Sequence, residues 1–257
     1  MPVDLLAGGV FLLDKPCGPT SFWVVRQVRR LLAMKKVGHA GTLDPFASGL
    51  LIVCAGRAAT RAIDTLMAGE KEYVATLCLG VRTSTGDPEG EIIERRPAQT
   101  FTDEQLEAVL NKFRGGYWQT PPAYSALKHR GKPLYAYARK GIVIDKPPRQ
   151  VLISSLSREI LAFSPIGVAA LTIRVRCGKG TYIRKLAEDI GDALGCGAHL
   201  TALRRTMSGP FQVERAVLAD ALRSEDGFGH LLAAKLSEAE LAGLLQEKAL
   251  PATVSEV

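Results

Sequence analysis

The chain has 257 residues, of which 47% are hydrophobic and 23% charged, and this is the composition of an ordinary globular protein with one large or two modest domains. Thirty-three lysines and arginines oppose 26 acids, so the net charge of +7 favours a polyanionic partner. No apolar run approaches the roughly 18 residues that a membrane span needs, and the start of the chain lacks the basic stretch of a signal peptide. We therefore expect a cytoplasmic protein without a membrane anchor.

The cysteines argue against a metal centre. They are five in number, scattered, and without a C-x-x-C pair; Cys196 and His199 make only a lone C-x-x-H. Reduced thiols that pack as small hydrophobic side chains fit this pattern better than a zinc site. The sequence also lacks an H-E-x-x-H motif and a Walker loop, so we expect neither a metal nor a nucleotide cofactor.

The first elements are a strand and an amphipathic helix. Gly9–Leu13 is predicted to be a short buried strand, and the following Gly18-Pro19 breaks the chain. Thr20 or Ser21 then caps a helix that is predicted to reach about Ala33. Three arginines lie off its apolar stripe and make a basic face, which fits a solvated surface or an RNA contact equally well. They are Arg26, Arg29 and Arg30.

Further elements follow a glycine-rich loop. Gly49–Ala55 is predicted to be a buried strand or the start of a helix, and Glu72–Leu79 a strand. Glu91–Arg95 is expected to pair with Glu72–Leu79 across a long loop, and Thr102 to cap a helix that ends near Phe113.

A basic segment occupies residues 119–149. It holds seven lysines and arginines against one acid, and it contains three tyrosines, Tyr124, Tyr135 and Tyr137. Such a stretch suits a flexible arm that closes on phosphates. A long surface loop is an equally good interpretation of the composition alone.

The last third begins with a strand and a helix. Residues 167–177 alternate cleanly between apolar and polar positions and predict a strand. A helix follows, with an apolar stripe from Ile183 to Leu194 and Gly195 at its end. Arg184 lies in the first turn of that helix, where a cation opposes the helix dipole, so we expect a carboxylate partner. Beyond residue 212 the chain is predicted to be mainly helical.

Asp44, within GHAGTLDPFASGLL, is an unusual position for a carboxylate in a basic chain. The residue before a proline is pushed out of the helical region, so Asp44 should be extended and displayed on a loop. Gly38 and Gly41 are expected to let this loop turn tightly. From spacing alone a helix cap is the commonest role for such an acid, followed by a general base or a nucleophile. A metal ligand is disfavoured because no second ligand cluster accompanies it.

At these residues the sequence resembles a known family. GHAGTLDPFASGLL resembles the catalytic signature of the TruB pseudouridine synthases, and four more stretches resemble family motifs in the same order. These stretches are GVFLLDKPCGPTS, KEYVATLCLGVRTSTGDPEG, QTPPAYSALKHRGKPLYAYARKG and CGKGTYIRKLAEDIGDALGCGAHLTALRRT.

The resemblance implies an α+β fold, the pseudouridine synthase fold, with a central mixed, mostly antiparallel sheet flanked by helices and loops and an RNA-binding cleft. Residues 1–211 would form the catalytic domain, with the basic arm inserted at about 119–149. Residues 212–257 would form a short helical tail where relatives commonly carry a full PUA domain.

The resemblance also implies a reaction, the isomerisation of uridine to pseudouridine at position 55 in the T loop of tRNA, with base flipping and without metal or cofactor. It makes three residues catalytic: Asp44 as the nucleophile, Tyr73 as a residue that packs on the target base and can take a proton, and Arg184 as the partner of Asp44. The substrate-binding residues that it implies are His39, Tyr182, Leu203 and Lys15. The partner would be the T stem-loop of tRNA, bound by a monomer.

Three alternatives remain open from the sequence. The protein could bind RNA as a chaperone without catalysis. It could be a glycoside hydrolase, which needs a second acid such as Asp87 or Asp189. It could also act on another RNA, as do the eukaryotic relatives that use guide RNAs.

Overall fold

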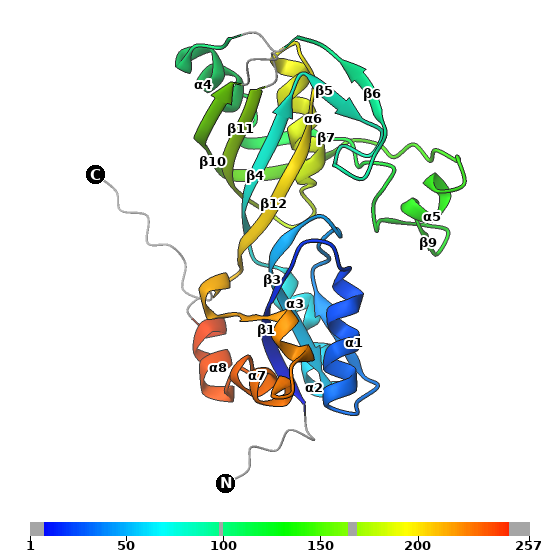
Figure 1. Cartoon of the computed structure of the whole chain (residues 1–257), viewed down its shortest axis with the longest axis vertical. Coiled ribbons are helices and arrows are strands. Elements are labelled where there is room, and N and C mark those ends of the chain that lie inside the picture. Colours follow the sequence, from blue (N-terminus) through cyan, green and yellow to red (C-terminus); the bar gives the residue numbers. More distant parts are fainter. Residues whose placement is uncertain (1–7, 98–99, 164–168, 247–257) are drawn as a thin grey trace. The chain divides into compact units, whose positions relative to one another are not determined.

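A computed structural model describes residues 8–97, 100–163 and 169–246 (Figure 1). The chain divides into two compact units, one made of residues 1–71 and 204–257 and the other of residues 72–203. In the described part of the chain, no helix combines the length and the apolar character that crossing a bilayer requires.

The first unit, here the N-terminal unit, is built on a small sheet. Strand β1 (Gly9–Lys15) pairs antiparallel with β3 (Ser48–Ala55) and parallel with β14 (Val217–Leu218). On the other side of β3 lie β2 (Val37–Ala40), which is antiparallel to it, and the last part of β12 (Ala198–Ser208), which is parallel. The prediction that Gly49–Ala55 is a strand is confirmed.

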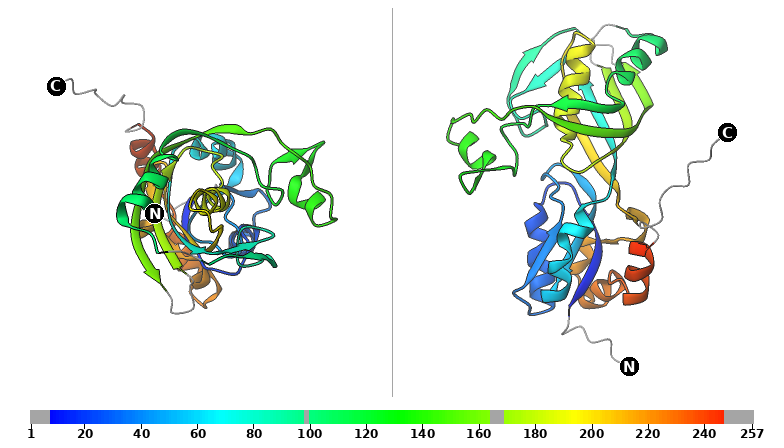
Figure 2. Two further views of the ribbon diagram at one scale, coloured as in Figure 1. Left: turned by 90° about the horizontal axis from the view of Figure 1, so that it is seen from above. Right: turned by 180° about the vertical axis from the view of Figure 1, so that it is seen from behind.

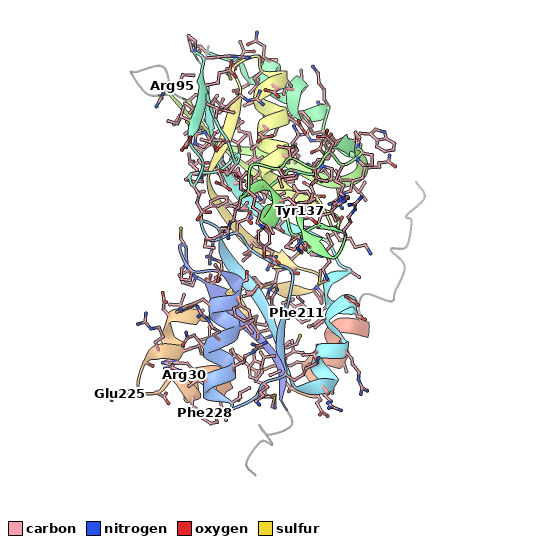
Figure 3. The ribbon with its side chains drawn as sticks, turned by 90° about the vertical axis from the view of Figure 1, so that its right-hand side faces the viewer. Arg30, Arg95, Tyr137, Phe211, Glu225 and Phe228 are labelled. Atoms are coloured by element: carbon pink, nitrogen blue, oxygen red, sulfur yellow. The ribbon has the colours of Figure 1, made fainter. Side chains whose placement is uncertain are left out.

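Both faces of this sheet are covered, which explains why β1 and β3 are almost continuously apolar. Odd-numbered residues of the two strands pack on one face, against α1 (Ser21–Leu31) and α7 (Gly227–Ala233). Even-numbered residues pack on the other face, against α3 (Ile63–Met67) and Phe211, which Figure 3 labels. Each large apolar side chain buried in this way contributes about 1.5–3 kcal/mol.

Helices and short elements complete the N-terminal unit. Thr20 caps α1, as predicted, and the helix ends at Leu31 rather than near Ala33. The remaining elements are α2 (Gly56–Arg61), β13 (Phe211–Gln212), the 3₁₀ turns η2 (Val213–Arg215) and η3 (Ala219–Arg223), and α8 (Glu238–Gln246). Residues 247–257 of the predicted tail lie outside the described residues.

The second unit, here the insert unit, has the strand order β12-β4-β11-β10-β7. Its strands are β4 (Lys71–Leu79), β7 (Gly115–Gln119), β10 (Arg149–Phe163) and β11 (Ala169–Cys177), with β10 antiparallel to both β11 and β7. The predicted alternation of β11 is confirmed for residues 169–177; residues 167 and 168 lie outside the described residues. Helix α6 (Ile183–Ala193) buries its predicted apolar stripe as far as Ile190, leaves Leu194 half-buried at its end, and lies against this sheet (Figure 2).

One predicted strand pairing is wrong. Strand β6 (Ile92–Arg95) pairs with β5 (Val81–Thr83) and not with β4. Gly80 has φ +86°, a conformation that glycine adopts without strain, so the chain turns after β4 and β5 becomes a separate partner. Helix α4 (Asp103–Asn111) begins at a Thr102 capping box, as the sequence predicts.

The basic segment forms a small subdomain of the insert unit. It contains β8 (Lys128–His129), β9 (Lys132–Pro133) and the short helix α5 (Leu134–Ala138). In both Figures 1 and 2 this segment extends to one side of the strands of its own unit. The predicted fold class, α+β with a mixed, mostly antiparallel sheet flanked by helices, is confirmed.

Gly49 gives a test of the N-terminal sheet. Its φ is +103°, and a Cβ there would lie 2.3 Å from the carbonyl oxygen of Arg205. Backbone strain together with this clash should make Gly49→Ala destabilising by at least about 2 kcal/mol in urea unfolding. Gly243→Ala is the control, because a Cβ at Gly243 meets nothing within 4 Å and alanine favours a helix by about 0.5–1 kcal/mol. Equal unfolding midpoints for the two variants would contradict the proposed packing of β3 against β12.

Candidate active site

Asp44 lies on the loop that joins β2 to β3. Its main-chain oxygen accepts a hydrogen bond from the Ala47 amide at 3.1 Å, which closes a tight turn over Pro45 and Phe46. No helix of the described residues begins at this turn, because the next helix, α2, starts only at Gly56. The helix-cap interpretation of Asp44 is therefore wrong, and its carboxylate is displayed from a turn, as expected of a residue that precedes proline.

Lys15 fixes the chain next to Asp44. It is completely buried, and its ammonium group donates to the carbonyls of Pro16, Pro19 and Pro45 at 2.9, 2.6 and 3.1 Å. A buried ammonium is costly unless its protons find acceptors, and here three carbonyls accept them. Lys15 thus holds Pro45 in place, while its predicted contact with substrate remains a prediction.

The N-terminal motif supplies four more hydrogen bonds to the same loop. The hydroxyl of Ser21 donates to the Leu43 carbonyl and accepts from the Leu43 amide, both at 2.9 Å. The Gly18 amide donates to the Pro45 carbonyl at 2.8 Å, and the Cys17 thiol donates to the Phe46 carbonyl at 3.0 Å. The main chain is therefore held immediately before and after Asp44.

Arg205 holds the ends of the loop. Its side chain is 1% exposed, and it donates from Nε to the Leu50 carbonyl at 2.7 Å and from Nη2 to the Gly41 carbonyl at 3.0 Å. Gly41 has φ +96° and makes the predicted turn, whereas Gly38 lies within β2 and makes none. A single guanidinium thus joins the residue where the loop begins to the strand into which it continues.

His39 lies on β2, opposite Val53 of β3. Burial, and to a lesser extent the charge of Arg205, lower the pKa of His39 from its usual 6.5. Its Nδ1 is buried and has no hydrogen-bond partner among the described residues. His39 is therefore a neutral imidazole at neutral pH, able to take part in hydrogen bonds rather than ion pairs.

Tyr73 and Arg184 belong to the insert unit. Tyr73 is half-buried on β4, two residues into the strand. Arg184, 5% exposed, donates to the carbonyls of Thr85 and Tyr124 at 2.8 and 2.6 Å and lies 3.5 Å from the Asp87 carboxylate. Asp87 is the carboxylate partner that the position of Arg184 on its helix calls for. The predicted pairing of Arg184 with Asp44 joins residues of different units and remains a prediction.

Asp87 and Asp189, the second acids that a glycoside hydrolase would need, are both engaged within the insert unit. Asp87 is buried; besides Arg184 it accepts from the Thr85 hydroxyl at 2.5 Å and from the Glu89 amide at 3.0 Å. Asp189 forms an ion pair with Lys185 at 2.6 Å. Neither carboxylate is placed as a free proton donor, and the glycosidase alternative loses its support.

Tyr182 and Leu203 also lie in the insert unit, at the start of α6 and on β12. The amide and carbonyl of Tyr182 are held by the side chain of Gln119, at 2.8 and 3.1 Å, and its ring lies 5.2 Å from the guanidinium of Arg149. Leu203 is buried. Gln119 and Arg205 were not among the predicted site residues, although both are polar groups on strands that the structure buries almost completely.

Metal binding finds no support in the described part of the chain, where no group of three or more histidine, cysteine or acidic side chains could hold an ion. The five cysteines are free thiols.

The structure brings together Lys15, His39 and Asp44 in one unit, and Tyr73, Tyr182, Arg184 and Leu203 in the other.

The effect of Arg205 on His39 can be measured by NMR. Arg205→Gln removes the positive charge but leaves the burial, so the pKa of His39 should rise towards 6.5 and remain below it. Arg204→Gln is the control, because Arg204 is half-buried and pairs with Asp14 instead. Titration of the four histidines in ¹H–¹⁵N spectra provides the values. A His39 that titrates at or above 6.5 in the unchanged protein would contradict this account.

The sequence was compared with known proteins. Residues 29–183 match the model described as TruB family pseudouridylate synthase (N terminal domain), and residues 184–242 match the tRNA pseudouridylate synthase B C-terminal domain. The tRNA pseudouridine synthase B of Desulfotalea psychrophila is 55% identical over 93% of this chain and 97% of its own length. That of Bordetella pertussis is 51% identical over 86% of this chain and 88% of its own length.

A solved structure agrees with these matches. A chain of a Cbf5–Nop10–Gar1 complex is 32% identical, with a TM-score of 0.65 over 90% of this chain. This chain spans 60% of the length of that one. The motif resemblance is thus confirmed over most of the sequence, and the chain belongs to the TruB family of pseudouridine synthases.

Proposed function

We propose that this protein isomerises uridine 55 in the T loop of tRNA to pseudouridine, with Asp44 as the nucleophile. The names of its curated relatives supply the substrate class. The observation that carries the assignment of Asp44 is the way its loop is held. Lys15, Ser21 and Arg205 bind the main chain on both sides of this one carboxylate.

The reaction requires only a nucleophile and proton transfers. The bond from N1 of uracil to C1′ of the ribose breaks, the base turns, and C5 bonds to C1′. The proton on C5 leaves and N1 takes up a proton, so no oxidant, metal or cofactor is consumed. A base stacked inside the T loop must first be flipped out, at a cost of a few kcal/mol that binding in the pocket offsets.

Asp44 must be ionised and immobile to act as the nucleophile, whether it attacks the base or C1′. Its loop supplies the immobility, because four neighbouring carbonyls are bound by side chains or amides. The family motifs imply that Arg184 pairs with Asp44 during the reaction; within the insert unit its guanidinium is oriented by the carbonyls of Thr85 and Tyr124 and by the carboxylate of Asp87.

The other predicted residues take supporting roles. Tyr73 packs on the target uracil and exchanges a proton with it. His39, as a neutral imidazole, forms hydrogen bonds with the flipped nucleotide, and Tyr182 and Leu203 complete the substrate-binding set, to which Lys15 contributes through the loop that it holds. The basic arm binds backbone phosphates of the T stem, since its lysines and arginines release condensed counterions.

Release of tritium tests the function directly. A tRNA transcript labelled at C5 of its uridines should lose about one tritium per molecule to water, because C5 becomes the glycosidic carbon. Asp44→Ala should abolish release while tRNA binding persists. The control is Asp64→Ala, which removes an exposed acid of α3 in the same unit and should release tritium normally.

The outcomes separate the alternatives. Binding without release by the unchanged protein would contradict the proposal and indicate an RNA chaperone. Release only after a guide RNA is added would place the protein with the guide-dependent enzymes instead.

Because Arg205 supports the loop of Asp44, its substitution should lower kcat more than it changes KM. Arg205→Lys keeps the charge but cannot span both Gly41 and Leu50, so Asp44 should shift and kcat should fall at least tenfold, with KM changed less than about threefold. Arg204→Lys, the neighbouring substitution, should leave kcat unchanged. Thermal unfolding of both variants identifies any loss of folding. A variant that loses only affinity for tRNA would contradict the positioning role.

A further inference from the structure

The N-terminal unit carries more positive charge in the sequence around Asp44 than the candidate active site accounts for. Residues 15–63 contain eight lysines and arginines, and Asp44 is the one acid among them. Part of this charge is structural, since Lys15 binds carbonyls, Arg29 donates to the Val37 carbonyl at 2.9 Å, and Arg30 donates to the Leu222 carbonyl at 3.2 Å. Arg30 lies near the end of α1 and reaches η3 (Figure 3). Two of the three arginines of the predicted basic face thus hold the fold together.

Three other cations gather at a hollow of the same unit. Lys36, Arg57, Thr60 and Arg61 line a cavity of about 350 Å³ where the chain enters β2 and leaves β3. The Gly56 amide donates to the Lys36 carbonyl at 2.8 Å, which joins the two segments. Among the described residues no carboxylate forms an ion pair with Lys36, Arg57 or Arg61.

The chemistry of this hollow suits a phosphate group. Like charges held close together repel one another, and a bound anion relieves this repulsion. Arginine offers paired N–H donors that match phosphate oxygens, and lysine adds a point charge. Thr60 shapes the site rather than binding in it, because its hydroxyl donates to the Gly56 carbonyl at 2.8 Å.

We propose that Lys36, Arg57 and Arg61 bind a backbone phosphate of the RNA substrate, an inference that rests on the proposed function. The hollow and the Asp44 loop lie at opposite ends of the β2–β3 hairpin. At about 3.3 Å per residue, the eight residues of β3 separate them by roughly 25 Å. The bound phosphate is therefore not that of the target nucleotide but one farther along the RNA.

The test compares Arg57→Ala and Arg61→Ala with Arg223→Ala. Arg223 is an exposed arginine of η3 in the same unit, with no ion pair among the described residues, and its substitution removes the same charge. Filter binding of full-length tRNA at several salt concentrations gives the Kd and its salt dependence. Each hollow variant should weaken binding several-fold and lower the slope of log K against log salt by about 1. At saturating tRNA, kcat should be unchanged.

Two results would overturn the proposal. One is a hollow variant whose Kd and salt slope equal those of Arg223→Ala. The other concerns inorganic phosphate. If millimolar phosphate stabilises the unchanged protein but not Arg57→Ala, and Arg57→Ala still binds tRNA normally, the hollow is a site for a small anion instead. Pseudouridine formation by the unchanged protein tests the proposed function separately, since the ratio of Kd values can be measured whether or not the product forms.

Discussion

Buried cations that bind main-chain carbonyls organise the N-terminal unit. Lys15 and Arg205 can remain charged inside the protein only because the carbonyls around them accept their protons. One carbonyl bound by each cation, that of Pro45 for Lys15 and that of Gly41 for Arg205, belongs to the loop that carries Asp44, so the burial of the cations and the shape of the loop depend on each other. An acid on an unrestrained turn would sample many positions, whereas this one stands on a backbone whose hydrogen bonds are already made.

The insert unit also contains a buried cation that main-chain carbonyls bind, here together with a carboxylate. Arg184 is buried at the start of α6, where the helix dipole disfavours it, and two carbonyls together with Asp87 compensate its charge. Gln119 holds the backbone of Tyr182 in the preceding turn. The side chain of Arg184 and the backbone around Asp44 are thus both held through main-chain groups, which do not depend on the identity of nearby surface residues.

Local patterns predicted much of this fold. The Thr102 cap and the alternation of β11 could be predicted from the sequence because each depends on residues that are close together in the chain. Strand β10 lacks a steady two-residue period, since two register shifts interrupt its pairing with β11. The roles of Arg205 and Asp87 could not be predicted from the sequence either. A hydrogen bond from Arg205 to Gly41 spans 164 residues and leaves no periodic trace.

The division of the chain has a consequence for synthesis on the ribosome. The N-terminal unit is discontinuous, because residues 72–203 are inserted between its two segments. The insert unit is a continuous stretch and can fold as soon as it has emerged. The loop of Asp44 is made early but lacks Arg205 until some 160 residues later. For most of translation a nascent chain would therefore carry Asp44 on a loop that Lys15 and Ser21 hold but Arg205 does not, and the set of restraints would be complete only as the last fifth of the protein is added.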